Sequence, residues 1–243
     1  MANPYSAPTS DVGQRGAYQP FDFETTFAQA WTALKASLWT LVAATLILGI
    51  AMTGSLVLIV VGWVCLLPAI MWGGAQFFLN TLDGRAELGD LWVGFQENYI
   101  YRSGQMLLLI VIFIALGFLS QAVYFLGVAL EDEILIIIGF VVQMVVQYAV
   151  LNRFYLTPFF LVDKGMSAIE AFSASWRSTS QQWLLFIAIA FIVALVQGLG
   201  VLLCCVGVLA SVPYGYLMFA SVYRQVTGTS RAPKVRRRRS EPS

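Results

Sequence analysis

Two long stretches without a charged residue limit this chain to very few folds. They run from Ala36 to Leu82 and from Ser178 to Tyr223. Each holds about 46 residues, roughly twice the ~20 residues that a helix needs to cross the hydrocarbon core of a bilayer. We therefore expect each stretch to form two membrane-spanning helices joined by a tight turn.

Two shorter uncharged stretches, Ser103 to Leu130 and Ile134 to Asn152, each have the length of one further span. The composition agrees, because 59% of the residues are hydrophobic and only 11% are charged, whereas soluble domains carry about 25% charged residues. The sequence thus predicts an all-α, polytopic membrane protein with six transmembrane helices.

The basic residues indicate how these helices are oriented. Every Lys and Arg falls before the first span, between the second and third, between the fourth and fifth, or after the sixth. The three opposite connections hold no basic residue, and one of them carries the acidic run Glu131 to Glu133. Because cytoplasmic segments are enriched in Lys and Arg, we expect both termini to be cytoplasmic.

Gly and Pro residues suggest the limits of individual spans. The first span is predicted from Leu38 to Met52 and the second from Leu56 to Asn80, with a turn at Thr53-Gly54-Ser55. Pro68 should kink the second span, because proline removes one helical hydrogen bond. The third and fourth spans, from near Gly104 to near Pro158, are longer, so they either tilt strongly or project their acidic tip outside the membrane.

Three helix starts share one pattern. Asp22, Asp90 and Ser167 are predicted N-caps of amphipathic helices that lie in the membrane interface, and Ser167 forms an S-x-x-E capping box with Glu170. Counted from these caps, a Phe follows at position five and another aromatic residue at position nine each time, namely Phe27 and Trp31, Phe95 and Tyr99, and Phe172 and Trp176.

This pattern indicates three copies of one unit, an interfacial helix followed by a transmembrane hairpin. The first and third copies also match at one constant offset, which pairs Gly62 with Gly207 and Pro68 with Pro213. Because each unit crosses the membrane twice, the repeats are parallel rather than inverted.

The units divide the chain into three parts. We expect a six-span transmembrane domain at residues 21–223, preceded by a disordered tail at 1–20 and followed by a basic tail at 224–243. Within the domain, the units cover about residues 22–82, 90–162 and 167–223.

Three short motifs carry a family resemblance: the Pro158 to Asp163 element, the Ala171-x3-Ser175-Trp176 continuation, and the F-x3-W start at Phe27 and Trp31. In these motifs the chain resembles a broad group of poorly characterised bacterial integral membrane proteins, related to the membrane domain of some glycerophosphoryl diester phosphodiesterases. The resemblance implies a multi-span helical protein, which we expect in the bacterial inner membrane. It does not imply the phosphodiesterase activity, which belongs to a separate soluble barrel with catalytic histidines, and this chain has no histidine.

The predicted hydrocarbon region offers few groups for catalysis. It holds no Asp or Glu, and without His the usual acid–base and metal-binding groups are missing. Cys65, Cys204 and Cys205 lie in apolar spans, where a thiol packs as a small hydrophobic group. We expect no enzyme activity, no cofactor and no metal site. The lack of a folded basic domain argues against nucleic-acid binding.

Amide side chains are the main polar groups of the spans. Gln143 and Gln147 are four residues apart and share one helical face. Together with Gln121 and Asn152 they are candidates for a polar track that binds a lipid headgroup or a solute. Hydrogen bonding between helices is the simpler interpretation of these amides.

Arg153 directly follows this group. If Pro158 lies at the same depth as Pro68 and Pro213, Arg153 lies below the headgroups and binds a lipid phosphate through its planar fork. If the fourth span instead ends at Asn152, the Arg153 side chain simply extends to the cytoplasmic interface. The second interpretation is the simpler one.

The C-terminal tail carries a basic cluster beside the membrane. Such a cluster gains ~1 kcal/mol per basic residue near an anionic leaflet, and it also holds the C-terminus inside. We expect contact with anionic headgroups from Lys234, Arg236, Arg237, Arg238 and Arg239.

Two functions fit these features. We expect a non-enzymatic membrane-organising or accessory protein that binds lipid or a protein partner, a second copy of the chain included. The alternative is a transporter or lipid-handling protein with a polar path between the third and fourth spans. A polar cavity containing Gln121, Gln143 and Gln147 would favour the alternative, and a tightly packed bundle would favour the first function.

Overall fold

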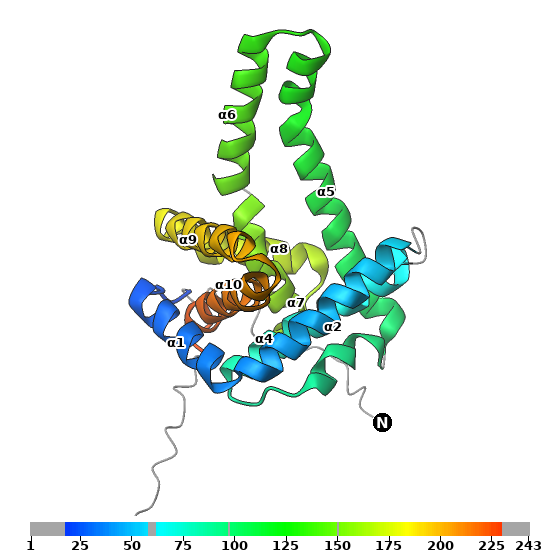
Figure 1. The fold of residues 1–243 in the computed structure, drawn as a ribbon, viewed down its shortest axis with the longest axis vertical. Helices are drawn as coiled ribbons and strands as arrows, with labels where there is room; N and C mark the ends of the chain where they lie inside the picture. The colour runs from blue at the N-terminus through cyan, green and yellow to red at the C-terminus, as the bar shows by residue number, and fades with distance from the viewer. Residues whose placement is uncertain (1–17, 58–61, 97, 150, 230–243) are drawn as a thin grey trace, which may run out of the picture.

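The computed structural model describes residues 18–57, 62–96, 98–149 and 151–229, and all regular elements in these ranges are helical (Figure 1). This confirms the predicted all-α class. In chain order the elements are α1 (Phe23–Ala36), α2 (Leu38–Val57), η1 (Gly62–Leu66), α4 (Leu67–Leu82), η2 (Leu88–Phe95), α5 (Tyr99–Ala129), α6 (Glu133–Ala149), η3 (Leu151–Leu156), α7 (Thr157–Lys164), α8 (Ala168–Ser180), α9 (Trp183–Leu202) and α10 (Cys204–Val226).

Several of these helices have the length and composition of membrane spans. In the described ranges four stretches qualify, namely Val64–Leu82, Tyr99–Ala129, Glu133–Lys164 and Trp183–Leu202. A fifth is added if α1 and α2, which meet at 89°, form one broken span. The protein is therefore a helical membrane protein with four to five candidate spans. The six predicted spans would in addition require α2 and α10 each to cross the membrane.

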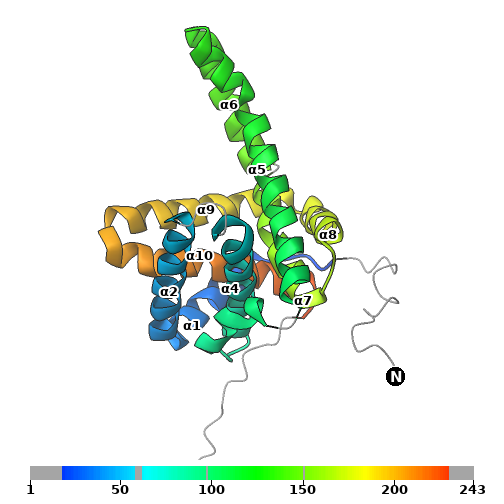
Figure 2. The ribbon, with the colours of Figure 1, turned by 90° about the vertical axis from the view of Figure 1, so that its right-hand side faces the viewer.

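The α5–α6 hairpin projects away from the rest of the molecule in both views (Figures 1 and 2). Its two stretches, at 31 and 32 residues, are the longest of the four candidates, as predicted. At the tip, Asp132 Oδ1 accepts hydrogen bonds from the backbone N–H groups of Ile134 and Leu135 (2.9 and 3.1 Å). Few side chains of the hairpin are buried, and such an extended apolar surface suits a lipid environment.

The predicted turn at Thr53-Gly54-Ser55 is wrong. Helix α2 continues through these residues to Val57, and the Thr53 hydroxyl donates to the Gly49 carbonyl inside the helix (2.8 Å). A small polar residue can satisfy its hydroxyl within a helix in this way, so its presence did not require a turn. Residues 58–61, which follow α2, lie outside the described ranges.

Two of the three predicted helix caps are confirmed. Asp22 Oδ2 accepts the Thr25 N–H at the start of α1 (2.8 Å). Ser167 and Glu170 form the reciprocal capping box at the start of α8. Both caps depend only on residues within one turn of the helix, which is why local sequence predicts them.

The second predicted interfacial helix is corrected by the structure. Asp90 is not an N-cap, because it lies inside the 3-10 helix η2, and α5 begins only after Asn98, which has a positive φ of 60°. The cause is close packing on α4. The Cβ that a side chain would add at Gly73 would lie 2.0 Å from the Leu91 carbonyl, and at Gly94 2.1 Å from the Ala69 carbonyl. The two backbones therefore touch directly.

The predicted interfacial segments connect the helices into a closed ring. In the structure η2 packs on α4, α8 packs on α7 and η3, and α1 packs on α10. The helices α4, α7 and α10 contact one another inside this ring. Residues from the beginning and end of the chain are thereby brought together.

The aromatic pairs at positions five and nine lie at these contacts. The rings of Phe27 and Trp31 both contact that of Tyr214 on α10, with centroids 5.9 and 6.2 Å apart. In the second unit Phe95 and Tyr99 stack on each other, and the Tyr99 hydroxyl donates to the Cys65 carbonyl (2.6 Å). These aromatic residues therefore lie where separate helical segments pack together.

The packed region extends further at both ends than predicted. The Tyr18 ring contacts that of Phe160, and the Gln19 N–H donates to the Val226 carbonyl (3.1 Å). Helix α10 ends at Val226 rather than Tyr223. Other residues of the predicted tails, 1–17 and 230–243, lie outside the described ranges.

Replacing Ser167 by Ala should destabilise the protein by about 1 kcal/mol, because α8 would lose its N-cap. The Glu170 carboxylate accepts hydrogen bonds from the Ser167 N–H and hydroxyl (3.0 and 2.9 Å), which holds the pKa of this carboxyl below its ordinary value. Since the folded-state pKa is lowered, this contribution is present above the unfolded pKa and is lost as the pH falls through the folded one. Thermal unfolding in detergent should therefore separate Ser167→Ala from wild type less at low pH than at pH 7. An equal difference at both pH values would contradict this account.

Candidate functional site

An apolar groove with a volume of about 1060 Å³ lies between α2, α4, α5 and α10. Leu48 on α2, Met71 on α4 and Phe113 on α5 are among its lining residues. Phe154 and Phe172 line it from η3 and α8. The groove is lined from α2 at one end of the chain to α10 at the other, and aliphatic and aromatic side chains dominate its lining.

Two threonine hydroxyl groups in the groove bond within their own helix. Thr45 donates to the Leu41 carbonyl and Thr53 to the Gly49 carbonyl, both at 2.8 Å. The Thr157 hydroxyl differs, because it is buried and has no hydrogen-bond partner in the described structure. A buried hydroxyl without a partner costs about 1–3 kcal/mol.

A second, polar cavity of about 220 Å³ lies between α6, η3, α9 and α10. Three amide side chains line it, those of Gln147, Asn152 and Gln197. The Gln147 Nε2 donates to the Asn152 Oδ1 at 3.4 Å. Because water occupies about 30 Å³ in the liquid, the cavity can hold several waters or a small polar molecule.

The structure brings together two of the four predicted amides. Gln147 and Asn152 meet at the polar cavity, whereas Gln121 and Gln143 do not line it. Gln197 of α9, absent from the predicted group, lies there instead. The cavity is thus between the fourth predicted span and the last hairpin, not between the third and fourth spans, because η3 packs against α9 and α10.

Arg153 packs on an aromatic ring. Its guanidinium carbon lies 4.4 Å from the centroid of Trp176, and its Nε is buried without a hydrogen-bond partner in the described structure. A guanidinium over an indole ring is a favourable cation–π contact. Trp residues concentrate at the membrane interface, so this contact fits a position near headgroup level.

Pro158 gives no measure of the depth of Arg153. The helices α4, α7 and α10 are each followed by a glycine with positive φ, at Gly84, Gly165 and Gly228. Pro158 precedes its glycine by seven residues, whereas Pro68 and Pro213 precede theirs by 16 and 15. The condition for the first interpretation of Arg153, a Pro158 at the same depth as Pro68 and Pro213, therefore finds no support in these positions.

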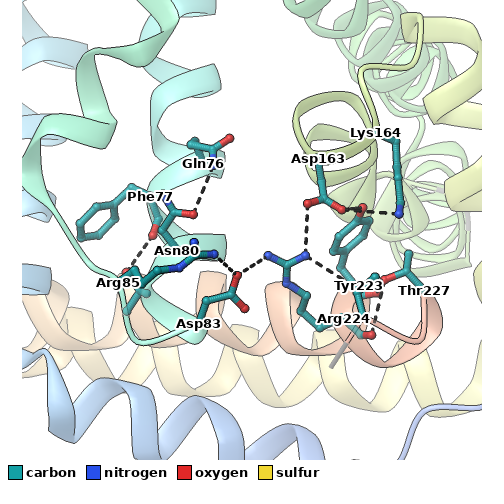
Figure 3. A network of polar contacts seen from close by, with 12 residues as sticks. Gln76, Phe77, Asn80, Asp83, Arg85, Asp163, Lys164, Tyr223, Arg224 and Thr227 are labelled. Atoms are coloured by element: carbon teal, nitrogen blue, oxygen red, sulfur yellow. Dashed lines mark hydrogen bonds and ion pairs between the residues drawn. The ribbon is translucent and has the colours of Figure 1, made fainter. Parts of the chain in front are cut away.

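An ion-pair cluster joins the ends of these three helices (Figure 3). Arg224 of α10 binds Asp83, which follows α4, and Asp163 of α7, at 2.8 and 3.2 Å. The Tyr223 hydroxyl donates to Asp163 Oδ2 at 2.6 Å. We call Asp83, Asp163, Tyr223 and Arg224 the three-helix cluster.

Sequence reasoning missed this cluster. It assigned Arg224 to the basic tail, and it used Asp163 only as the end of a motif. A signal was present, because Asp83 and Asp163 each lie within two residues of the glycine that follows their helix, and Arg224 lies four residues before Gly228. Only the ring of packed units shows that these three positions meet.

The remaining predicted groups have simple outcomes. The tail residues Lys234 and Arg236 to Arg239 lie outside the described ranges, and the side chains of Cys204 and Cys205 are not described either. Cys65 is a free, partly buried thiol. Within the described ranges no group of three or more His, Cys, Asp or Glu side chains is placed to hold a metal ion.

Comparison with known proteins places most of the chain in one family. Residues 23–233 match a family described as a domain of unknown function, DUF7847. No curated protein and no solved structure matches the chain. Membership of an uncharacterised domain family is thus confirmed, and the relation to phosphodiesterase membrane domains stays a prediction.

Proposed function

The chain belongs to the DUF7847 family, and we propose that it is a non-enzymatic membrane-organising or accessory protein that binds membrane lipid in its apolar groove. The groove of about 1060 Å³ is the observation that carries this proposal. Ligand-binding pockets have volumes of several hundred Å³ up to about 1,000 Å³, so the groove is large enough to hold a ligand. At membrane depth, acyl chains are the apolar molecules available to fill it, and packed contacts favour a filled groove over an empty one.

The proposed architecture has six spans in three parallel units, with both termini on the cytoplasmic side of a bacterial inner membrane. The ring of contacts between α1, η2, α8 and the second helices supports the three-unit arrangement. The one-sided distribution of Lys and Arg supports the orientation. In this arrangement the basic tail faces anionic cytoplasmic headgroups, and a protein partner or a second copy is a further proposed contact.

Filling the groove should displace the lipid. Gly74 lines the groove on α4, and a Cβ there would lie 3.8 Å from the nearest Leu48 atoms, so Gly74→Leu adds bulk without a backbone clash. We expect native mass spectrometry of this variant, purified in mild detergent, to show loss of most of the phospholipid retained by wild type.

Gly117→Leu is the matched control. Gly117 lies on α5, where a Cβ meets open space, and it does not line the groove. This variant should retain lipid as wild type does. Equal retention by Gly74→Leu and Gly117→Leu would overturn the proposal.

Handling of a polar solute is a second candidate function. The polar cavity at Gln147, Asn152 and Gln197 favours it. It ranks below lipid binding because Gln147 and Asn152 already bond to each other, so the cavity exposes fewer unsatisfied groups to a solute.

A further inference from the structure

We propose that Arg153 and Thr157 bind the phosphate group of a phospholipid whose acyl chains lie in the apolar groove. The inference rests on the proposed function and names the lipid class, one with a phosphate in its headgroup. Arg153 lies in η3, and Thr157 follows one turn later at the start of α7.

A continuous aromatic stack connects Arg153 with the groove. The guanidinium lies over Trp176, and the Trp176 ring contacts that of Phe154 with centroids 6.2 Å apart. Phe154 in turn stacks on Phe172 at 3.9 Å, and both phenylalanines line the groove. A lipid with its chains against Phe154 and Phe172 therefore has its polar end within reach of Arg153.

Arg153 has no anionic partner within the part of the chain that the structure describes. Arg85 and Arg224, by contrast, both form ion pairs with Asp83. A cation in a membrane-spanning stretch strongly favours an anion. The Nε of Arg153 has no hydrogen-bond partner in the described structure, and the planar fork of a guanidinium matches two oxygens of one phosphate.

Thr157 supplies a second donor. Thr53 and Thr81 each donate their hydroxyl to the carbonyl four residues earlier, a common arrangement in helices. For Thr157 that carbonyl belongs to Arg153, and it accepts the Ser175 hydroxyl instead. The Thr157 residue is 2% exposed and lines the groove, and its hydroxyl has no partner in the described structure. A phosphate or ester oxygen of the lipid would satisfy this hydroxyl.

The test compares three probes on the full chain in neutral detergent by native mass spectrometry. These are phosphatidylglycerol, diacylglycerol with the same acyl chains, and inorganic phosphate. Wild type should bind phosphatidylglycerol more tightly than diacylglycerol, and inorganic phosphate should not compete. Arg153→Ala should weaken phosphatidylglycerol binding by about tenfold or more, as expected for loss of a charge-assisted hydrogen bond, and leave diacylglycerol binding unchanged.

Three further variants make the result specific. Thr157→Val should show a smaller loss in the same direction, and Arg177→Ala should behave as wild type because Arg177 is exposed and lies beside Trp176 in sequence. Arg153→Lys keeps the charge without the fork and should fall between Arg153→Ala and wild type. The melting temperature of the Arg153→Lys variant separates a loss of lipid binding from a folding defect.

Each alternative result would overturn one defined part of the proposal. If Arg153→Ala keeps the full preference for phosphatidylglycerol, the phosphate site is wrong and groove binding stands. If inorganic phosphate displaces the lipid, the site binds a free anion instead of a phospholipid. If wild type binds neither lipid, the proposed function itself fails.

Discussion

Replacing Arg224 by Ala should destabilise the protein by about 3–5 kcal/mol, the usual cost of removing one partner from a buried ion pair. Arg224 contacts Asp83 and Asp163 at 2.8 and 3.2 Å, and its side chain is 11% exposed. Without it, two carboxylates would face each other at the junction of three helices with no guanidinium between them. The effect should lie toward the lower end of the range because Asp163 is 22% exposed.

Arg85→Ala provides the matched control, since Arg85 pairs with the same Asp83 carboxylate at 3.1 Å. Its side chain is 63% exposed, and exposed pairs contribute only about 0–1 kcal/mol. Unfolding in detergent, followed by circular dichroism, should separate the two variants clearly. Similar small losses for both would show that the three-helix cluster does not hold the units together.

Replacing Gly73 by Ala should destabilise the protein by about 3 kcal/mol, at the upper end of the usual cost of overpacking. The added Cβ would lie 2.0 Å from the Leu91 carbonyl oxygen, which belongs to the backbone of η2 and cannot rotate away. Gly94→Ala should act in the same way, because its Cβ would lie 2.1 Å from the Ala69 carbonyl oxygen of α4. In both variants η2 must move off α4.

Gly104→Ala tests whether the loss comes from this contact. Gly104 lies in α5, where a Cβ meets open space, and Ala is favoured over Gly in a helix by about 1 kcal/mol. We therefore expect this variant to be as stable as wild type or more stable in the same unfolding measurement. Equal destabilisation at Gly73 and Gly104 would contradict the proposed backbone contact.

Local sequence predicted the helix starts where one turn of chain contains all the interacting groups. Asp22 and Ser167 are such cases, because each cap bonds only to residues up to three positions away. Asp90 looked identical in sequence and is not a cap, because η2 packs on α4 through Gly73 and Gly94. The segment around Asp90 adopts its conformation because it packs on α4. Since α4 is a separate helix, no pattern within the segment itself reveals this contact.

The candidate site was predicted only in part for the same reason. Arg153 and the Gln147–Asn152 pair were identified from polarity inside an apolar stretch, which is a local property. Gln197 and Thr157 were not identified as site residues, because their importance depends on which helices surround them. The depth of Arg153 was left open between two interpretations, and Pro158 does not decide between them because it lies closer to the end of its helix than Pro68 does.

The sequence by itself determined the helical class and the long apolar stretches that suit a membrane, since apolar runs are properties of consecutive residues. Only the tertiary structure decided that α10, near the end of the chain, contacts α1 near its beginning. That closure places Arg224 between Asp83 and Asp163 and encloses the apolar groove. Ion pairs and cavities of this kind depend on which surfaces, distant in sequence, pack together. Many contacts around the whole ring of helices contribute to the free energy of that packing, so no single stretch of sequence determines it.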